Sequence, residues 1–373
     1  MKKKILIIIP SLTIGGGAEK IAASLTNRLS EKFEISILTF YDFKNIYPHK
    51  GVHVSLKQNS KTWQKLFLPF KIYKKIKSIA PDIIMSFMDY TSIITFFTKF
   101  MFHIKVPLIV CSHTNPKIAY RNKLWYIKFL TKLVYPSKLV SKIVTVSFET
   151  QYILEKNFKI NHNKIKTIYN GIDIDEIQNL KNERISIYDK IFYNKDLIKF
   201  IIVGRLREEK RHNYLIRAFS KVKTHLPNSR LIIIGDGPLR KELEQLIEKL
   251  KLKNDVLLMG LRRNPYKYMA NSDIFILSSR YESFPIVLLE ALACGLPIIS
   301  TDCKTGPREI LDNGKYGLLP DENNFEDLIN NMLLLAKNKD LMKKYSLLSL
   351  ERAEYFDFNN VAAKWIKFLE TQF

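Results

Sequence analysis

The chain has 373 residues, about twice the length of a typical domain, so two domains are expected. Apolar residues make up 46% of it and aromatic residues 12%, which excludes the polar composition of disordered chains. Sixty Lys and Arg against 36 Asp and Glu give a formal charge of +24, which predicts an anionic partner: nucleic acid, anionic lipid or a phosphorylated substrate.

The cysteines and the apolar runs indicate the cellular compartment of the protein. Cys111, Cys294 and Cys303 show no close spacing of a metal site or disulfide framework, which favours a reduced, cytoplasmic chain. The first apolar run stops at Pro10, too short for a signal peptide. The longest uncharged apolar runs, such as 90–98, are about half the length that spans a bilayer, so no transmembrane segment is expected.

The first half of the chain has the pattern of a parallel sheet with helices between its strands. Residues 4–39 contain an apolar run, a glycine-rich turn, an amphipathic stretch and a second apolar run at 35–40, which predicts a strand–helix–strand unit. Further short apolar runs, predicted as strands, lie at 83–87, 108–111 and 143–146.

A second series of strands follows a polar stretch. Residues 174–198 lack a sustained apolar period, and we place an interdomain link there. Later apolar runs, separated by helical segments, predict strands at 200–203, 231–234, 256–259, 274–277 and 297–300. The tail, 326–373, has a helical pattern.

The predicted fold class is therefore α/β, with two Rossmann-like doubly wound domains that face a central cleft. The predicted domain boundaries are 1–178 for the first domain, 179–198 for the linker, 199–355 for the second domain, and 356–373 for a final helix that packs back toward the first. Helix amino termini around such a cleft suit a phosphorylated ligand.

Gly15, Gly16 and Gly17 lie between the first predicted strand and a helix expected to begin near Ala18. Without β-carbons, they allow a ligand to approach the backbone and the helix amino terminus. A tight turn with a structural role explains them equally well, and the dinucleotide fingerprint is absent. On the residues alone, both interpretations stay open.

The most specific pattern is at 278–290. Glu282 follows a predicted strand, and Glu290 lies eight positions later in the helix that the loop opens. The unsatisfied amino terminus of that helix, a site for a diphosphate, is predicted at Phe284, Pro285, Ile286 and Val287. Ionised carboxylates only accept hydrogen bonds, so Glu282 and Glu290 could bind the hydroxyls of a sugar and a ribose. The alternative is a loop acid and a helix salt bridge.

Two cations follow the first strand of the second predicted domain. Arg205 and Lys210 would project toward the cleft and neutralise a leaving diphosphate, which stabilises the charge that develops as a glycosidic bond breaks. For an isolated cation in so basic a chain, an ordinary surface position is the simpler interpretation.

Taken in order, these motifs resemble the retaining glycosyltransferase family 4, which has the GT-B fold. The motifs that carry the resemblance are the glycine-rich first loop, Cys111-Ser112-His113, Asn170-Gly171-Ile172-Asp173, Gly204-Arg205 with Lys210, Gly235-Asp236-Gly237-Pro238, and Glu282 through Glu290. The best match is to bacterial members that extend lipid-linked oligosaccharides, lipopolysaccharide cores or capsules. Asn264 to Met269 and Gly306 to Glu309 also look like such enzymes.

The resemblance implies a role for each site residue. Arg205 and Lys210 would bind the donor diphosphate, Glu290 the ribose, and Glu282 the transferred sugar. His113, which follows the predicted strand 108–111, would position the donor sugar. The resemblance also implies a glycosyl transfer in which the donor's own phosphate deprotonates the acceptor.

Gly16 and Gly17 are expected to contact the donor. No cofactor and no metal are expected, because Asp173 and Asp175 are more simply explained as the cap of a short helix. We expect Gly235 to Pro238 to form a turn into a helix at Leu239, outside the site.

Basic and aromatic residues are interleaved in the first half. Between Asp42 and Glu149, eighteen Lys and Arg face two acids, and the stretches 61–77 and 117–142 contain no acid. This composition predicts an anionic membrane face, although many of the apolar members could simply belong to the core.

The predicted function is transfer of a hexose or N-acetylhexosamine from a nucleotide sugar, expected to be a UDP-sugar, to a lipid-linked or envelope glycan, with formation of an α linkage. The enzyme is expected in the cytoplasm, peripheral on the inner face of the cell membrane. The alternatives are a sugar-nucleotide epimerase on the same fold and a nucleic-acid-binding protein; the chain has no recognised nucleic-acid motif, so no nucleic-acid partner is expected.

Overall fold

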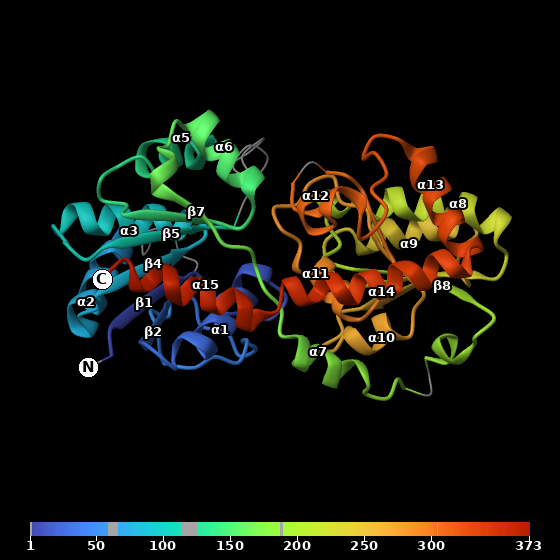
Figure 1. Ribbon diagram of the computed structural model, residues 1–373, viewed down its shortest axis with the longest axis horizontal. Helices are drawn as coiled ribbons and strands as arrows, with labels where there is room; N and C mark the ends of the chain where they lie inside the picture. Colours follow the sequence, from blue (N-terminus) through green and yellow to red (C-terminus); the bar gives the residue numbers. More distant parts are fainter. Residues whose placement is uncertain (1, 59–65, 114–124, 187–188, 304) are drawn as a thin grey trace. The chain divides into compact units, whose positions relative to one another are not determined.

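The computed structural model describes residues 2–58, 66–113, 125–186, 189–303 and 305–373. Packing divides the chain into two compact units (Figure 1). The first unit comprises Met1–Asn170 and Asn359–Phe373, and the second comprises Gly171–Phe358. Each unit contains one parallel sheet with its own hydrophobic core.

The first unit is built on a seven-stranded parallel sheet of order β3-β2-β1-β4-β5-β6-β7. Its strands are β1 (Lys4–Ile9), β2 (Glu34–Thr39), β3 (Val52–Ser55), β4 (Ile83–Phe87), β5 (Leu108–Ser112), β6 (Lys142–Thr145) and β7 (Ile165–Thr167). The side chains at 5–9 are fully buried, as expected of a parallel strand covered on both faces.

Helices connect the strands of the first sheet. They are α1 (Gly17–Leu29), α2 (Leu68–Ile79), α3 (Asp89–Met101), α5 (Trp125–Val134) and α6 (Phe148–Phe158). Helix α2 packs on α3, and α3 packs on α5. Pro69 is tolerated in α2 because it stands in the first turn, where its missing N–H has no intrahelical partner.

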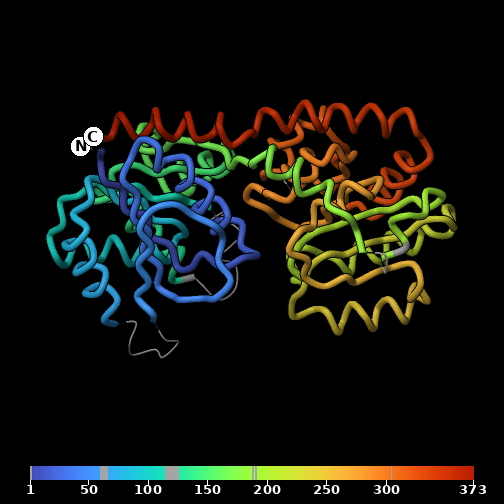
Figure 2. Tube along the Cα trace, turned by 90° about the horizontal axis from the view of Figure 1, so that it is seen from below, coloured from blue at the N-terminus to red at the C-terminus, as the bar shows by residue number. Residues whose placement is uncertain are grey.

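The last helix, α15 (Phe358–Glu370), closes the first unit from the far end of the sequence. Glu370 forms a 3.0 Å ion pair with Lys32, and the rings of Phe33 and Phe373 lie 5.7 Å apart. Figure 2 shows the two chain ends side by side.

The second unit is built on a five-stranded parallel sheet of order β10-β9-β8-β11-β12. Its strands are β8 (Ile198–Val203), β9 (Ser229–Ile234), β10 (Val256–Gly260), β11 (Ile274–Leu277) and β12 (Ile298–Ser300). Its helices are α7 (Ile174–Lys181), α8 (His212–His225), α9 (Arg240–Lys249), α10 (Tyr266–Ala270), α11 (Ile286–Ala293), α12 (Pro307–Ile310), α13 (Phe325–Lys337) and α14 (Lys339–Tyr355).

The predicted linker 179–198 is wrong in position, because its described residues, 179–186 and 189–198, belong to the second unit. Helix α7 runs into the stretch, and the Gln178 side chain donates a 2.8 Å hydrogen bond to the Ala293 carbonyl. The division falls instead between Asn170 and Gly171. The polar composition of 179–198 reflects a solvent-facing surface of the second unit and not a linker between units.

The fold class is confirmed as two Rossmann-like α/β domains. In the first sheet the strand order reverses between β1 and β4, and in the second between β8 and β11. Ligands of open α/β sheets bind at the carboxyl ends of the strands beside such a reversal. Within the described residues, no helix has the length and apolar character to cross a bilayer.

Candidate active site

In the second unit, the loops after β8 and β11 meet at the reversal of strand order. The Arg280 amide donates a 2.8 Å hydrogen bond to the Glu209 carbonyl. The Ser278 hydroxyl donates a 2.8 Å bond to the Lys210 carbonyl. These contacts join two loops that are far apart in sequence, because β8 and β11 are neighbours in the sheet.

The two loops bring together Lys210 and Glu282. The Lys210 Nζ lies 2.5 Å from Glu282 Oε1, and the Ser279 hydroxyl donates a 2.7 Å hydrogen bond to the same oxygen. Only 19% and 13% of the two side chains are exposed, so solvent screens the pair less than a surface ion pair. The Thr305 hydroxyl donates to the Glu282 backbone carbonyl and holds the loop. The predicted cation and the predicted sugar-binding carboxylate are thus one ion-paired unit.

Helix α11 begins immediately after this loop. Its cap residue, Pro285, supplies no side-chain hydrogen bond to the first turn. Gly306 has a φ of +50°, and a β-carbon there would lie 2.8 Å from both the Ser283 carbonyl oxygen and the Pro285 ring. Glycine is therefore required where this backbone passes the amino end of α11.

Glu290 lies one turn inside α11 and is 8% exposed. The Tyr266 hydroxyl donates a 2.9 Å hydrogen bond to its Oε1. The structure thus places Glu282 in the loop before α11 and Glu290 one turn inside the helix. Phe284, which lies between them in the sequence, is buried and packs edge-on against Phe356 at 5.7 Å.

Arg205 is exposed on the loop after β8. The path of that loop depends on the neighbouring glycines, since a β-carbon at Gly235 would collide with the Gly204 carbonyl and one at Gly237 would lie 2.5 Å from the Leu206 carbonyl. The turn at 235–238 therefore shapes the backbone under Arg205.

In the first unit, the glycine loop follows β1. Gly16 caps α1, which begins at Gly17, and the Glu19 carboxylate occupies the space that a β-carbon on Gly16 would fill. The Gly15 amide donates a 3.0 Å hydrogen bond to the Tyr47 hydroxyl. The chain itself thus uses the missing β-carbon of Gly16, and donor contact by Gly16 and Gly17 stays a prediction.

His113 follows β5 and stacks on Phe87, with ring centroids 5.2 Å apart and an interplanar angle of 21°. Burial lowers the pKa of His113 from 6.5 to about 4, because desolvation penalises the charged imidazolium. The side chain is then neutral at physiological pH and suits positioning better than proton donation.

We expect His113 to stay neutral between pH 5.5 and 8. A carbon-13-labelled histidine titration by NMR, with the resonance assigned from a His113→Gln variant, should show no midpoint in that range. A midpoint near the ordinary value of 6.5 would contradict the burial seen here and reopen a role in proton transfer.

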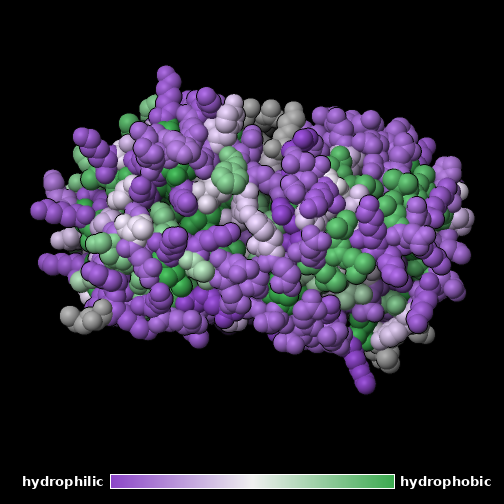
Figure 3. All heavy atoms as spheres, in the orientation of Figure 1, coloured by the Kyte–Doolittle hydropathy of each residue, from purple (hydrophilic) through white to green (hydrophobic). Residues whose placement is uncertain are grey.

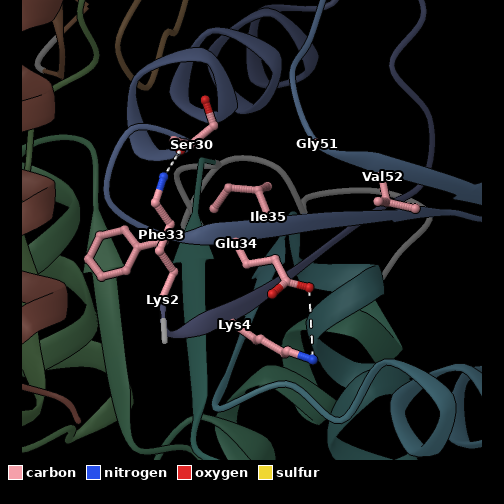
Figure 4. Close-up of a pocket in the computed structure, with 8 residues that line it drawn as sticks. All are labelled: Lys2, Lys4, Ser30, Phe33, Glu34, Ile35, Gly51 and Val52. Carbon is pink, nitrogen blue, oxygen red and sulfur yellow. Dashed lines mark hydrogen bonds and ion pairs between the residues drawn. The ribbon is translucent and has the colours of Figure 1, made fainter.

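A hollow on the surface of the first unit lies at the amino ends of strands β1, β2 and β3, opposite the carboxyl ends where ligands of such sheets bind. It has a volume of about 600 Å³ and includes Lys4, Glu34 and Val52, the first residues of β1, β2 and β3 (Figure 4). Lys4 and Glu34 are 3.8 Å apart there, and Lys2 donates to the Ser30 carbonyl at 3.1 Å. None of the predicted site residues lines it, so it is separate from the candidate site.

No group of three or more potential metal ligands gathers among the described residues. The capping role predicted for Asp173 is confirmed: its carboxylate accepts a 3.0 Å hydrogen bond from the Glu176 amide at the start of α7.

Sequence reasoning gave no role to three residues that support the site: Ser279, Thr305 and Tyr266. Ser279 contacts Glu282 directly, and Tyr266 contacts Glu290. The 264–269 motif was visible in the sequence, but nothing in it indicated a contact with a residue 24 positions later.

Both halves of the chain match models of glycosyltransferase domains. Residues 15–176 match Glycosyltransferase Family 4, and residues 184–347 match Glycosyl transferases group 1. Fold and matched domains together define a glycosyltransferase. The chain belongs to glycosyltransferase family 4, as the sequence resemblance indicated.

Relatives in both sequence and structure cover most of the chain. An uncharacterized glycosyltransferase of Methanocaldococcus jannaschii is 35% identical, covering 84% of this chain and 86% of that protein. A Campylobacter jejuni N-acetylgalactosamine-N,N'-diacetylbacillosaminyl-diphospho-undecaprenol 4-alpha-N-acetylgalactosaminyltransferase is 33% identical, covering 98% and 99%. Anabaena HepE, solved with UDP and glucose, is 21% identical with a TM-score of 0.81, covering 99% and 100%, and shows the shared fold.

Proposed function

We propose that the enzyme transfers a hexose or N-acetylhexosamine from a UDP-sugar to a lipid-linked or envelope glycan, with retention and an α linkage. The observation that carries the proposal is the Lys210–Glu282 pair beside the amino terminus of α11, at the strand reversal of the second sheet. A cation and the amides at the start of a helix suit a diphosphate, and a carboxylate suits sugar hydroxyls. The Campylobacter relative, named for an α-N-acetylgalactosaminyl transfer onto a diphospho-undecaprenol-linked glycan, supports the substrate class.

Each residue has a proposed part. Lys210 and Arg205 neutralise the diphosphate, assisted by the amides at the start of α11. Glu282 accepts hydrogen bonds from the transferred sugar, and Glu290 accepts them from the ribose. His113 and the loop at Gly16 and Gly17 contact the donor from the first unit.

The proposed transfer of the sugar needs no protein side chain to act as a base. The bond between the anomeric carbon and the diphosphate oxygen breaks, and its electron pair stays on that oxygen. The acceptor hydroxyl oxygen forms the new bond on the same face of the sugar, and its proton passes to the departing phosphate. The protein's contribution is to stabilise the negative charge that develops on the diphosphate. Lys210 and Arg205 are proposed to be in position for this before the bond breaks, so no reorganisation is needed during the step.

The enzyme is proposed to work in the cytoplasm, docked on the inner face of the cell membrane through its first unit. Phe67 and Phe70 are exposed on or beside α2, where Lys74 lies 4.5 Å from the Phe70 ring centre. On α5, Phe129 is 62% exposed and Leu133 58%. Figure 3 shows apolar patches among hydrophilic side chains on this unit. Exposed rings beside lysines suit an anionic headgroup layer.

The two basic stretches, 61–77 and 117–142, are described only in part. Of the two stretches, residues 61–65 and 117–124 lie outside the described residues. The described remainder still combines cations with exposed rings, so the docking proposal rests on α2 and α5.

The epimerase and nucleic-acid alternatives have no support from the glycosyltransferase relatives.

The proposal is tested by incubating the purified enzyme with membranes and a panel of nucleotide sugars. One UDP-sugar should be consumed, with UDP released and the sugar recovered in an organic-soluble glycolipid. Consumption without a glycosylated product, or conversion of the sugar to its epimer, would contradict the transferase assignment.

Transfer should survive a strong chelator. Two side-chain cations and helix amides supply the positive charge that a divalent metal supplies elsewhere. The rate measured after dialysis against EDTA should equal the untreated rate, and added magnesium or manganese should not raise it. A rate lost on chelation and restored by either ion would overturn the metal-free mechanism.

A further inference from the structure

Glu290 is an unusual residue for its position in the second unit. Helix α11 has the sequence IVLLEALA, in which Glu290 is the one charged residue, and its side chain is buried. Burying a carboxylate costs free energy unless it is hydrogen-bonded. Where a helix needs only packing, an apolar side chain would serve better, so a buried carboxylate here calls for a function.

The hydroxyl of Tyr266 supplies a defined partner. It donates a 2.9 Å hydrogen bond to Glu290 Oε1, and Tyr266 is itself only 6% exposed. Helical side chains lean toward the amino terminus, so the Glu290 side chain lies over the turn that contains Ile286 and Val287. The carboxylate is thus held near the amides proposed to bind the diphosphate.

Tyr266 is held by its own contacts. Its amide donates a 3.0 Å hydrogen bond to the Asn264 side chain, and the Asn264 amide group donates a 2.7 Å bond to the Leu180 carbonyl at the end of α7. Helix α10 packs against both α7 and α11. The phenol is therefore a fixed donor that leaves Glu290 little rotational freedom.

We propose that Tyr266 is a positioning residue for the donor nucleoside, which rests on the proposed binding of ribose by Glu290. Its hydroxyl orients the Glu290 carboxylate so that this group accepts hydrogen bonds from the ribose hydroxyls. Tyr266 then sets how strongly the enzyme prefers a ribonucleoside diphosphate to one that lacks those hydroxyls.

The test compares the affinities of UDP and 2′,3′-dideoxy-UDP by calorimetry. Wild type should prefer UDP by about tenfold to a hundredfold, the value of a hydrogen bond to a charged group. Tyr266→Phe should lower that preference by about three- to tenfold and leave the affinity for dideoxy-UDP unchanged. A merely structural role would weaken both ligands equally and leave the preference intact.

Tyr268→Phe is the matched control. Tyr268 lies on the same short helix, is equally buried, and donates a 3.2 Å hydrogen bond to a different carboxylate, that of Asp189. This variant should keep the wild-type preference. Melting temperatures of the two variants would show any general loss of stability.

Glu290→Gln separates failure of this inference from failure of the proposed function. If wild type has no preference, or Glu290→Gln keeps it, the ribose assignment of Glu290 is wrong. If Glu290→Gln abolishes the preference while Tyr266→Phe retains all of it, Glu290 binds ribose but Tyr266 does not position it. A preference lowered in both variants, with Tyr268→Phe unchanged, supports the inference.

Discussion

Lys210→Ala should lower kcat by about 10²–10³-fold, the loss typical of removing one group that stabilises transition-state charge. Lys210 lies at the reversal of the second sheet, where its ammonium group is largely shielded from solvent. There it would meet the charge on the departing diphosphate. Arg205→Ala should act in the same direction but less strongly, because Arg205 is exposed to solvent. Steady-state kinetics at saturating donor measure both effects.

The ion pair with Glu282 provides a second possible cause of a lower kcat in Lys210→Ala, and this cause must be separated from the loss of charge stabilisation. Lys210→Ala leaves Glu282 with its Ser279 hydrogen bond but without its cation, so the carboxylate could shift or repel the diphosphate. The double variant Lys210→Ala with Glu282→Gln removes that repulsion. We expect it to be about 10²–10³-fold slower than Glu282→Gln alone, because the loss of the cation still matters when no repulsion remains.

Lys241→Ala is the matched control, since Lys241 is an exposed lysine of the same unit on α9. It should retain the wild-type rate. Wild-type turnover in Lys210→Ala, or recovery of the rate in the double variant, would show that Lys210 does not stabilise the leaving group.

Charge reversal on α2 should abolish binding to anionic vesicles. Each cation near an anionic surface contributes about 1 kcal/mol, so changing Lys71, Lys74 and Lys75 to Glu should weaken binding by at least about a hundredfold. Co-sedimentation with vesicles containing phosphatidylglycerol, beside neutral phosphatidylcholine vesicles, measures the effect. Wild-type binding should fall as salt rises, because the Debye length is about 8 Å at physiological ionic strength.

The control for net charge is the same reversal on the second unit, at the exposed Lys241, Lys249 and Lys253. That variant carries an identical formal charge and should still bind. Docking through the first unit is wrong if wild type ignores anionic vesicles, or if the two triple variants bind equally. A soluble acceptor would then be the better explanation.

Most of the fold was predictable because its signal is local. The buried parallel strands β1 and β8 contain the continuous apolar runs 5–9 and 200–203, which few other structures explain. Strands β3 and β7 escaped prediction because neither is a run of buried apolar residues: β3 has no fully buried residue and β7 has one. The linker was misplaced because polarity reports solvent exposure and does not report which unit a segment packs against.

The sequence predicted which residues belong to the site but not the contacts between them. Lys210 and Glu282 were both expected near a donor, but their ion pair depends on β8 and β11 being neighbours, which no local pattern reveals. The contact between Tyr266 and Glu290 depends in the same way on how α10 packs against α11. Such contacts follow from tertiary packing.

A crystal structure of the enzyme with bound UDP tests the central claim most directly. The diphosphate should lie at the amino terminus of α11, within hydrogen-bond distance of its first amides and of Lys210 Nζ, with the ribose hydroxyls on Glu290. UDP bound in the hollow beside Lys4 and Glu34, or bound away from both Lys210 and α11, would contradict the account.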